Sequence, residues 1–279
     1  MTLKQLPWQM GAQDEASAMA KMALISSSKR GDTMTSIQPL PTMYDLPSES
    51  PEDPGLPDEF HRLQADLLIR TFQPATYPED RVFSAADLNL YYDLHNRNYY
   101  KRPDWFGVVD VPRKVDAGRM SYVRWQERHS PMIVVELLSP STIEEDQGLT
   151  SRGRTPPSKW EVYESILRVP YYVLFDRLTN RVQMFELRGT SYQELFVDRL
   201  WIDALGIGLG LWFGAFSGDE RLWLRWYNAE GNWIPTSDEL AESERRARLE
   251  AEAKLIAERR RNELLSERLR ALGIDPDAL

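Results

Sequence analysis

Apolar residues recur along the chain in two patterns, one typical of helices and one typical of strands. In the segment 58–72, Phe60, Leu63 and Leu67 follow helical spacing, and Asp58 stands where a helix cap is needed. A second amphipathic helix is predicted over 158–168. Runs of β-branched, aromatic and leucine residues predict strands at 81–93 (as a strand or a bent hairpin arm), 105–111, 132–138, 170–176, 181–188 and 191–197. This order of elements predicts an α/β domain, of the α+β kind with a mixed sheet.

The pattern changes twice towards the C-terminus. Residues 200–216 and 221–234 continue as turn-rich β structure, with a hairpin around Asn228–Asn232. From Thr236 the chain is rich in Glu, Arg, Ala and Leu, and a capping box of Thr236 with Glu239 predicts a helix that ends at Gly273. Two interpretations of this helix stay open: a coiled-coil arm that makes a homo-oligomer, or a solvated appendage.

The N-terminal part lacks a periodic pattern. Residues 1–57 are rich in Pro, Ser and Asp and predict an extended arm, with a short helix at 14–28. The predicted organisation is therefore an arm over 1–57, a domain with a β extension over 58–235, and a charged helix over 236–279.

The amino-acid composition excludes several kinds of functional site. The 279 residues include no Cys and three His, which excludes thiolate metal sites and cysteine nucleophiles and fits a reducing cytosol. Any bound metal is expected to have oxygen ligands, as Mg²⁺, Mn²⁺ and Ca²⁺ prefer. The net charge of −9 gives no overall basic footprint for nucleic acid, although local patches can differ from the total. No apolar run is long enough to span a membrane, so we expect a cytoplasmic protein.

Two acidic residues stand next to or inside apolar strands. Asp104 follows Pro103 at the start of "WFGVVDV", and Glu136 interrupts "MIVVELL". Burying a carboxylate is costly unless a partner compensates its charge, and two such residues on neighbouring strands suggest a shared cation. Mg²⁺ is commonly held by one or two carboxylates together with water and phosphate oxygens.

The ordered set of Pro103-Asp104, "VVELLSPST", Lys159-x-x-x-Tyr163 and "VPYYVLFD" resembles the Uma2 family. These restriction endonuclease-like proteins are abundant in cyanobacteria and belong to the PD-(D/E)xK nuclease superfamily. The resemblance covers roughly residues 58–200. It implies a mixed-sheet core flanked by helices, dependence on Mg²⁺ or Mn²⁺, and hydrolysis of phosphodiester bonds.

The resemblance also implies roles for individual residues. Asp104 and Glu136 match the metal ligands, and Lys159 matches the catalytic lysine that such sequences carry on the following helix. Leu138 stands where the superfamily usually has its lysine, and the insertion "QGLTSRGRTPPS" separates Asp146 from Lys159. The accessory candidates are His61, Asp146, Arg152 and Arg154.

Each of these residues also has an ordinary structural interpretation. Asp104 is compatible with a turn, Glu136 with an edge strand, Lys159 with a solvated helix start and His61 with a generic helix position. Tyr163 is expected in the core rather than in catalysis. Two functions therefore stay open: a metal-dependent endonuclease that acts on nucleic acid, with DNA favoured, or a catalytically impaired nuclease-fold protein that binds partners through its C-terminal helix.

Overall fold

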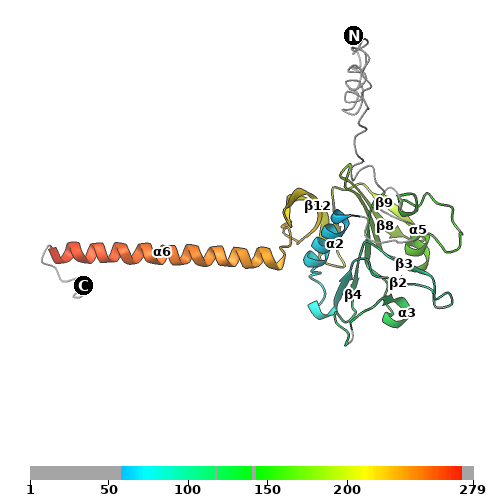
Figure 1. Cartoon of the computed structure of the whole chain (residues 1–279), viewed down its shortest axis with the longest axis horizontal. Helices are drawn as coiled ribbons and strands as arrows, with labels where there is room; N and C mark the ends of the chain where they lie inside the picture. The colour runs from blue at the N-terminus through cyan, green and yellow to red at the C-terminus, as the bar shows by residue number, and fades with distance from the viewer. Residues whose placement is uncertain (1–57, 117, 140–142, 272–279) are drawn as a thin grey trace, which may run out of the picture. The chain divides into compact units, whose positions relative to one another are not determined.

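The structure of the chain is a computed structural model that describes residues 58–116, 118–139 and 143–271 (Figure 1). All of these residues belong to one compact unit, Ser48–Leu279. The expected arm over 1–57, with its helix at 14–28, lies outside the described residues and stays a prediction.

A six-stranded sheet forms the centre of this unit. Its strands lie in the order β1-β4-β6-β7-β8-β9. The strands are β1 (Val82–Ala85), β4 (Trp105–Val109), β6 (Ile133–Leu137), β7 (Tyr171–Asp176), β8 (Arg181–Arg188) and β9 (Ser191–Leu195). Strands β6 and β7 pair in parallel and the other neighbours pair antiparallel, which confirms the predicted mixed sheet.

Both faces of the central sheet are covered, which explains the nearly continuous apolar runs of its inner strands. Strands β4 and β6 are buried along their whole lengths. Side chains alternate between the faces of a strand, so Trp105 and Val135 enter one core while Phe106 and Val134 enter the other.

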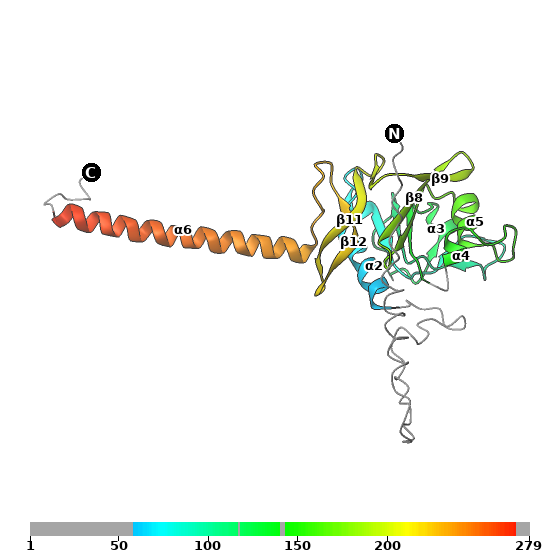
Figure 2. The same ribbon diagram turned by 90° about the horizontal axis from the view of Figure 1, so that it is seen from above.

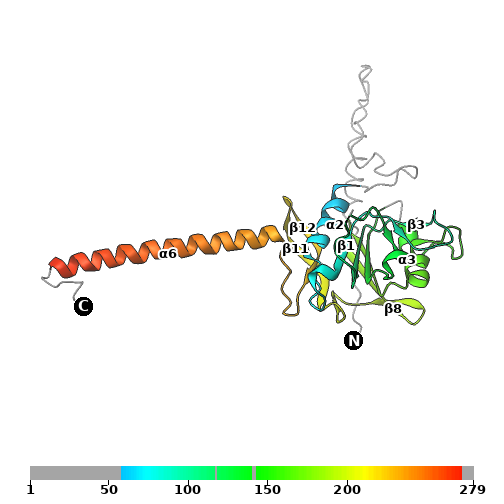
Figure 3. The ribbon, with the colours of Figure 1, turned by 90° about the horizontal axis from the view of Figure 1, so that it is seen from below.

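Helix α2 (Glu59–Thr71) packs on the first of these cores, and the helix predicted over 58–72 is confirmed. The Asp58 carboxylate accepts a hydrogen bond from the backbone N–H of His61 and so caps the helix. Leu67 and Leu68 are fully buried. In all three views, α2 lies between the central sheet and the strands β11 and β12 (Figures 1, 2 and 3).

The C-terminal β structure is a separate antiparallel sheet. It consists of β10 (Arg199–Ile202), β11 (Ile207–Phe216) and β12 (Asp219–Tyr227). The buried side chain of Gln64, on α2, donates to the backbone oxygen of Leu224 at 2.8 Å and accepts from its backbone nitrogen at 2.9 Å. These paired hydrogen bonds fix α2 against β12.

A turn and a long helix follow β12. Asn228 and Asn232 close the predicted turn, since the Asn228 N–H donates to the Asn232 oxygen at 2.8 Å. Helix α6 (Ser237–Ala271) begins with the predicted capping box, in which Thr236 and Glu239 exchange hydrogen bonds of 2.7 and 3.3 Å. No residue of α6 is buried, and the predicted end at Gly273 lies outside the described residues.

The first turn of α6 is attached to the second sheet through a buried arginine. Arg225 of β12 is 3 % exposed, its guanidinium lies 4.2 Å from the Trp212 ring centroid, and it donates to Ile234 O and to the Glu239 carboxylate. A buried charge without a partner is costly, so Glu239 stabilises this sheet as well as capping the helix.

Short elements complete the described residues. They are the 3₁₀ turn η1 (Glu79–Arg81), the strands β2 (Leu90–Tyr91), β3 (Tyr100–Lys101) and β5 (Tyr122–Val123), the helices α3 (Arg124–Glu127), α4 (Ile143–Asp146) and α5 (Lys159–Glu161), and the π-helical turn η2 (Val162–Ile166). Strands β2, β3 and β5 form a third small sheet. None of the helices in the described ranges could cross a membrane, because each is too short or too polar.

The boundaries of two predicted strands differ from the structure. The segment 81–93 contains β1 and β2, which belong to different sheets, and Asp87 between them adopts a left-handed conformation with φ of 51°. The strand predicted over 105–111 ends at Val109, because the next residue, Asp110, has φ of 62°.

Candidate active site

Asp104 and Glu136 lie beside each other on neighbouring strands. Trp105 of β4 pairs with Val135 of β6, so the residues next to them meet at the same end of the two strands. The Asp104 backbone N–H donates to Glu136 Oε2 at 3.2 Å, and the Leu137 N–H donates to Asp104 Oδ2 at 2.6 Å. The two carboxylates therefore converge on one side of the sheet.

The buried carboxylate of Glu136 has two side-chain partners. Glu136 is 0 % exposed, its Oε2 lies 3.1 Å from the Lys159 ammonium, and its Oε1 accepts a hydrogen bond of 2.8 Å from the Tyr163 hydroxyl. These contacts offset part of the cost of burying the Glu136 carboxylate.

Lys159 reaches this carboxylate in spite of the insertion that precedes it. Ser158 caps α5 by accepting from the Glu161 N–H at 3.2 Å, and Glu145 Oε1 accepts from the Lys159 N–H at 2.8 Å. The lysine side chain is only 15 % exposed, and its ammonium lies between Glu136 and Asp146 Oδ1, which is 2.9 Å away.

Leu138 occupies the position two residues after Glu136. Its backbone N–H donates to Phe175 O at 2.9 Å, so it continues the pairing with β7. The ammonium group near Glu136 comes from Lys159 instead, on a different element.

Asp146 lies on the far side of the Lys159 ammonium from Glu136. It ends α4 and is 0 % exposed. Its Oδ2 has no hydrogen-bond partner among the described residues. Such a buried oxygen is available to a cation or to water.

The contact of the Tyr163 hydroxyl with Glu136 was not predicted from the sequence. Tyr163 was expected in the core, and its ring does pack there against Tyr172, but its hydroxyl holds Glu136. Tyr163 lies on η2, whose wider turn is closed by the Leu167 N–H donating to Val162 O at 2.8 Å. The spacing of four residues between Lys159 and Tyr163, on one face of a helix, was the available signal.

His61 lies next to the site but has no free ring nitrogen. Nδ1 is 2.9 Å from Asp58 Oδ1 and Nε2 is 3.1 Å from Leu137 O. Both partners are acceptors, so these contacts favour the imidazolium form, in which both ring nitrogens donate. Burial opposes this charge, but the hydrogen bond to Asp58 and the charge of Asp104 raise the pKa of His61 above its usual value. His61 therefore positions the end of β6 and contributes positive charge, and it has no nitrogen left to orient water.

The structure does not bring Arg152 and Arg154 to the paired carboxylates. Arg152 lies 2.8 Å from Glu164 Oε2 and is 64 % exposed, and Arg154 lies 3.0 Å from Glu145 Oε2. These two ion pairs attach the inserted loop to its surroundings.

Burial is the largest single influence on the pKa of each ionisable group in the site, and neighbouring charges are the next. Burial raises the pKa of Asp104 and holds the pKa of Glu136 well above its usual range, although the Lys159 ammonium opposes both shifts. Burial lowers the pKa of Lys159, but the carboxylates of Asp146, Glu136 and Asp104 outweigh it and hold that pKa well above its usual value. Lys159 is therefore charged at neutral pH.

The residues present fit a hard divalent cation. Within the described part of the chain, no three acidic or imidazole groups form a complete metal site. Asp104 and Glu136 nevertheless supply the two carboxylates that Mg²⁺ commonly takes from a protein, with water and phosphate oxygens filling the other positions. The unpartnered Asp146 Oδ2 is a further oxygen nearby.

The domain is a mixed α/β sheet in which carboxylates from two neighbouring strands lie side by side. The family model "Uma2: Putative restriction endonuclease" matches residues 38–215, which is more than half of the chain. The chain belongs to the Uma2 family. The match ends within β11, before β12 and α6 begin.

Comparison with solved structures finds a "putative nuclease belonging to DUF820" from Anabaena variabilis, with 14 % sequence identity and a TM-score of 0.27. The alignment covers 43 % of this chain and 58 % of that one. No curated protein matches the sequence.

Proposed function

We propose that this protein is a Mg²⁺- or Mn²⁺-dependent endonuclease that hydrolyses phosphodiester bonds in DNA. The observation that carries the proposal is the convergence of Asp104, Glu136 and Lys159 at one end of β4 and β6. Membership in the Uma2 family supports a nuclease activity.

Each residue has a role that its contacts support. Asp104 and Glu136 would hold the metal, which when bound activates water and offsets the charge of the phosphoryl group. Lys159, being charged, would donate to a phosphate oxygen and stabilise the negative charge that builds up during hydrolysis, rather than accept a proton. Tyr163 orients Glu136, and Asp146 holds the Lys159 ammonium between two carboxylates.

The test is cleavage by purified protein of plasmid DNA, single-stranded DNA and RNA, each with Mg²⁺, Mn²⁺ or EDTA. Glu136→Gln and Asp104→Asn should abolish cleavage. Lys159→Gln should lower the rate by about 10²- to 10³-fold, as expected for loss of one preorganised charge. Lys254→Gln on α6 removes the same charge from an exposed position and should leave the rate unchanged. Equal cleavage by wild type and Glu136→Gln would contradict the proposal.

A second candidate function is partner binding through α6, with the sheet domain catalytically inactive. The observation that favours it is the exposure of apolar side chains along α6, including Leu249 at 57 % and Ile256 at 53 %. A homo-oligomer formed through this helix would cover them. Absence of cleavage under every condition above, together with self-association through α6, would favour this candidate.

A further inference from the structure

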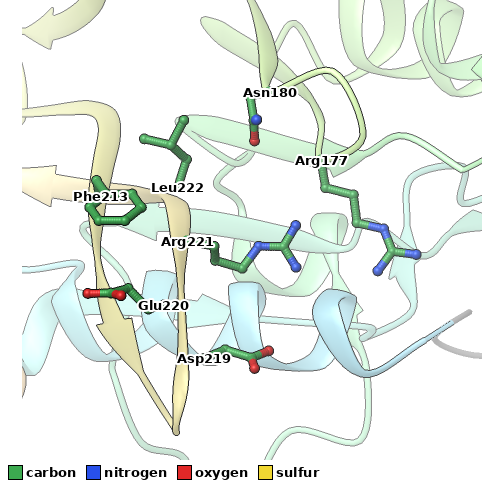
Figure 4. Close-up of a pocket in the computed structure, with 7 residues that line it drawn as sticks. All are labelled: Arg177, Asn180, Phe213, Asp219, Glu220, Arg221 and Leu222. Atoms are coloured by element: carbon green, nitrogen blue, oxygen red, sulfur yellow. The ribbon is translucent and has the colours of Figure 1, made fainter. Parts of the chain in front are cut away.

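A pocket of about 390 Å³ lies near the N-terminus of α2, and neither Asp104 nor Glu136 lines it (Figure 4). Arg177 and Asn180, from the turn between β7 and β8, form one side of it, and the start of β12, including Asp219 and Arg221, forms the other. The Arg221 side chain extends from β12 towards Arg177, and the Arg177 side chain runs down from the turn (Figure 4).

Arg221 is held in place by aromatic rings. Its guanidinium carbon lies 4.4 Å from the Phe60 ring centroid and 5.5 Å from that of Trp223, and these two rings stack on each other. Its Nε is buried and has no hydrogen-bond partner, and among the described residues Arg221 forms no ion pair. A buried guanidinium nitrogen without an acceptor is costly, so an anion that paired with the Arg221 guanidinium would be bound favourably.

Arg177 brings a second positive charge to the same ring. Its guanidinium carbon lies 5.4 Å from the Phe60 centroid, and the group forms an ion pair with Asp58. Both guanidinium groups therefore lie near Phe60, at one pocket, where an anion could accept from either of them. The fixed fork of N–H donors on each arginine matches the oxygens of a phosphate group.

A short chain of contacts joins the pocket to the candidate active site. Arg177 pairs with Asp58, whose carboxylate contacts His61 Nδ1, and His61 Nε2 contacts the backbone oxygen of Leu137, next to Glu136. The pocket and the carboxylates therefore flank the same end of α2.

Acidic groups also lie at the pocket. The Glu220 side chain points away from the two guanidinium groups, and the Asp219 carboxylate lies on their far side from Asn180 (Figure 4). Both residues are exposed, so water screens their charges. Asp219 would weaken anion binding without preventing it. Removing its charge should therefore strengthen binding, the opposite of the effect expected for the arginines.

We propose that Arg177 and Arg221 bind a backbone phosphate of the nucleic-acid substrate, at a position along the strand away from the phosphate that is cleaved. The identity of this ligand rests on the proposed function, whereas the anion site rests on the geometry of the two arginines. Arg221 would donate from a guanidinium that the rings have already ordered, and Arg177 would donate the N–H groups that Asp58 leaves free.

The experiment measures the binding of a fluorescein-labelled DNA duplex to the full chain by anisotropy, in EDTA and at several salt concentrations. Arg221→Gln and Arg177→Gln should each weaken binding about tenfold, which corresponds to one charge-assisted hydrogen bond. Because both arginines contact one phosphate, the two substitutions together should reduce the slope of log Kd against log salt by about 0.9. Asp219→Asn should tighten binding.

Two controls separate charge from folding. Arg246→Gln removes an exposed arginine of α6 and should leave the affinity unchanged. Arg221→Lys keeps the charge and the aliphatic stem on Phe60, so it should fold like the wild type and bind with intermediate affinity. Thermal unfolding of each variant shows whether its fold is intact.

The outcomes distinguish this proposal from the proposed function. If the wild type cleaves DNA but neither arginine variant changes the affinity or the salt slope, the pocket is not a phosphate site and the nuclease proposal stands. If the wild type binds DNA through these arginines without cleaving it, the pocket proposal stands and the nuclease proposal fails. Absence of binding at low salt would overturn both.

Discussion

At the scale of single residues, ionised Glu136 lowers the stability of the folded protein when no cation is bound. Burial holds the pKa of Glu136 well above the value near 4.5 that we expect in the unfolded chain, so ionising it disfavours the folded state. This cost is absent below pH 4.5 and grows as the pH rises towards the pKa of the folded state. Functional sites commonly contain such destabilising groups.

Glu136→Gln should therefore become more stable relative to the wild type as the pH rises from 4 to 8 in EDTA. Lys159 keeps Asp146 as an ionic partner in this variant. Thermal unfolding at each pH measures the difference, and parallel curves would contradict the assignment. Mg²⁺ should raise the melting temperature of the wild type and have little effect on that of the variant, because a ligand stabilises only the state that binds it.

Tyr163→Phe tests the hydrogen bond that orients Glu136. The ring packing against Tyr172 survives, but a buried carboxylate oxygen loses its donor, which should cost about 1.5–3 kcal/mol. Tyr122→Phe is the matched control, because its hydroxyl donates to the neutral backbone oxygen of His129 and should cost about 0.5–1.5 kcal/mol. Urea unfolding compares the two, and a smaller loss for Tyr163→Phe would show that this contact does not support the carboxylate.

The sequence allowed the paired carboxylates to be foreseen because an acid inside an apolar strand stands out without any tertiary information. The resemblance to the Uma2 family suggested that Lys159 would lie near Glu136, and the two side chains are in contact. The partners of Tyr163, His61 and Arg152 could not be foreseen in the same way, since they depend on how elements far apart in the chain pack together. Arg152, for example, pairs with Glu164 on the other side of the insertion.

At the scale of elements, strand β4 next to the site is tightly packed against neighbouring aromatic rings. Gly107 lies in the middle of β4, and a Cβ atom added there would come within 2.7 Å of the Phe72 ring and 2.8 Å of the Trp105 ring. Its backbone is ordinary strand, so its lack of a side chain serves packing rather than an unusual conformation.

Gly107→Ala should therefore destabilise the fold by about 1–3 kcal/mol through overpacking. Phe72→Leu in the same chain makes room, so the double variant should lose less than the sum of the two single losses. Urea unfolding of the four proteins measures this coupling. Additive losses would show that Phe72 does not restrict this position.

Helices and inner strands were predicted well because helical periodicity and continuous apolar runs both report burial directly. The ends of strands were predicted less well where a single backbone conformation decides them, as at Asp87 and Asp110. Aspartate tolerates a positive φ but does not require one, so the sequence does not indicate these positions. The π-helical turn of η2 has no periodic signature within five residues.

At the scale of the whole molecule, α6 has two parts with different roles. Its first turn supplies Glu239 to the buried Arg225 and Asp238 to Arg70, while no residue beyond it in the described helix is buried. A deletion that begins at residue 237 therefore removes structural contacts as well as the exposed helix.

Deletion of residues 248–279 keeps these contacts and should leave the melting temperature nearly unchanged. Deletion of 237–279 should lower it, because Arg225 loses its ionic partner. If α6 forms a homo-oligomer, both deletions should reduce the mass in solution to that of a monomer, as measured by light scattering. An unchanged number of chains per particle after the shorter deletion would rule out self-association through the deleted part of this helix.

The side chain of Gln64 hydrogen-bonds to both backbone groups of Leu224, as a neighbouring strand would. The Uma2 match includes Gln64 but ends before β12, so an amide inside the shared domain serves a strand outside the matched region. Relatives that possess a strand equivalent to β12 should retain Gln or Asn at this position, and relatives without one have no such need. Gln64 is thus a sequence marker that would sort family members by architecture before any of their structures is known.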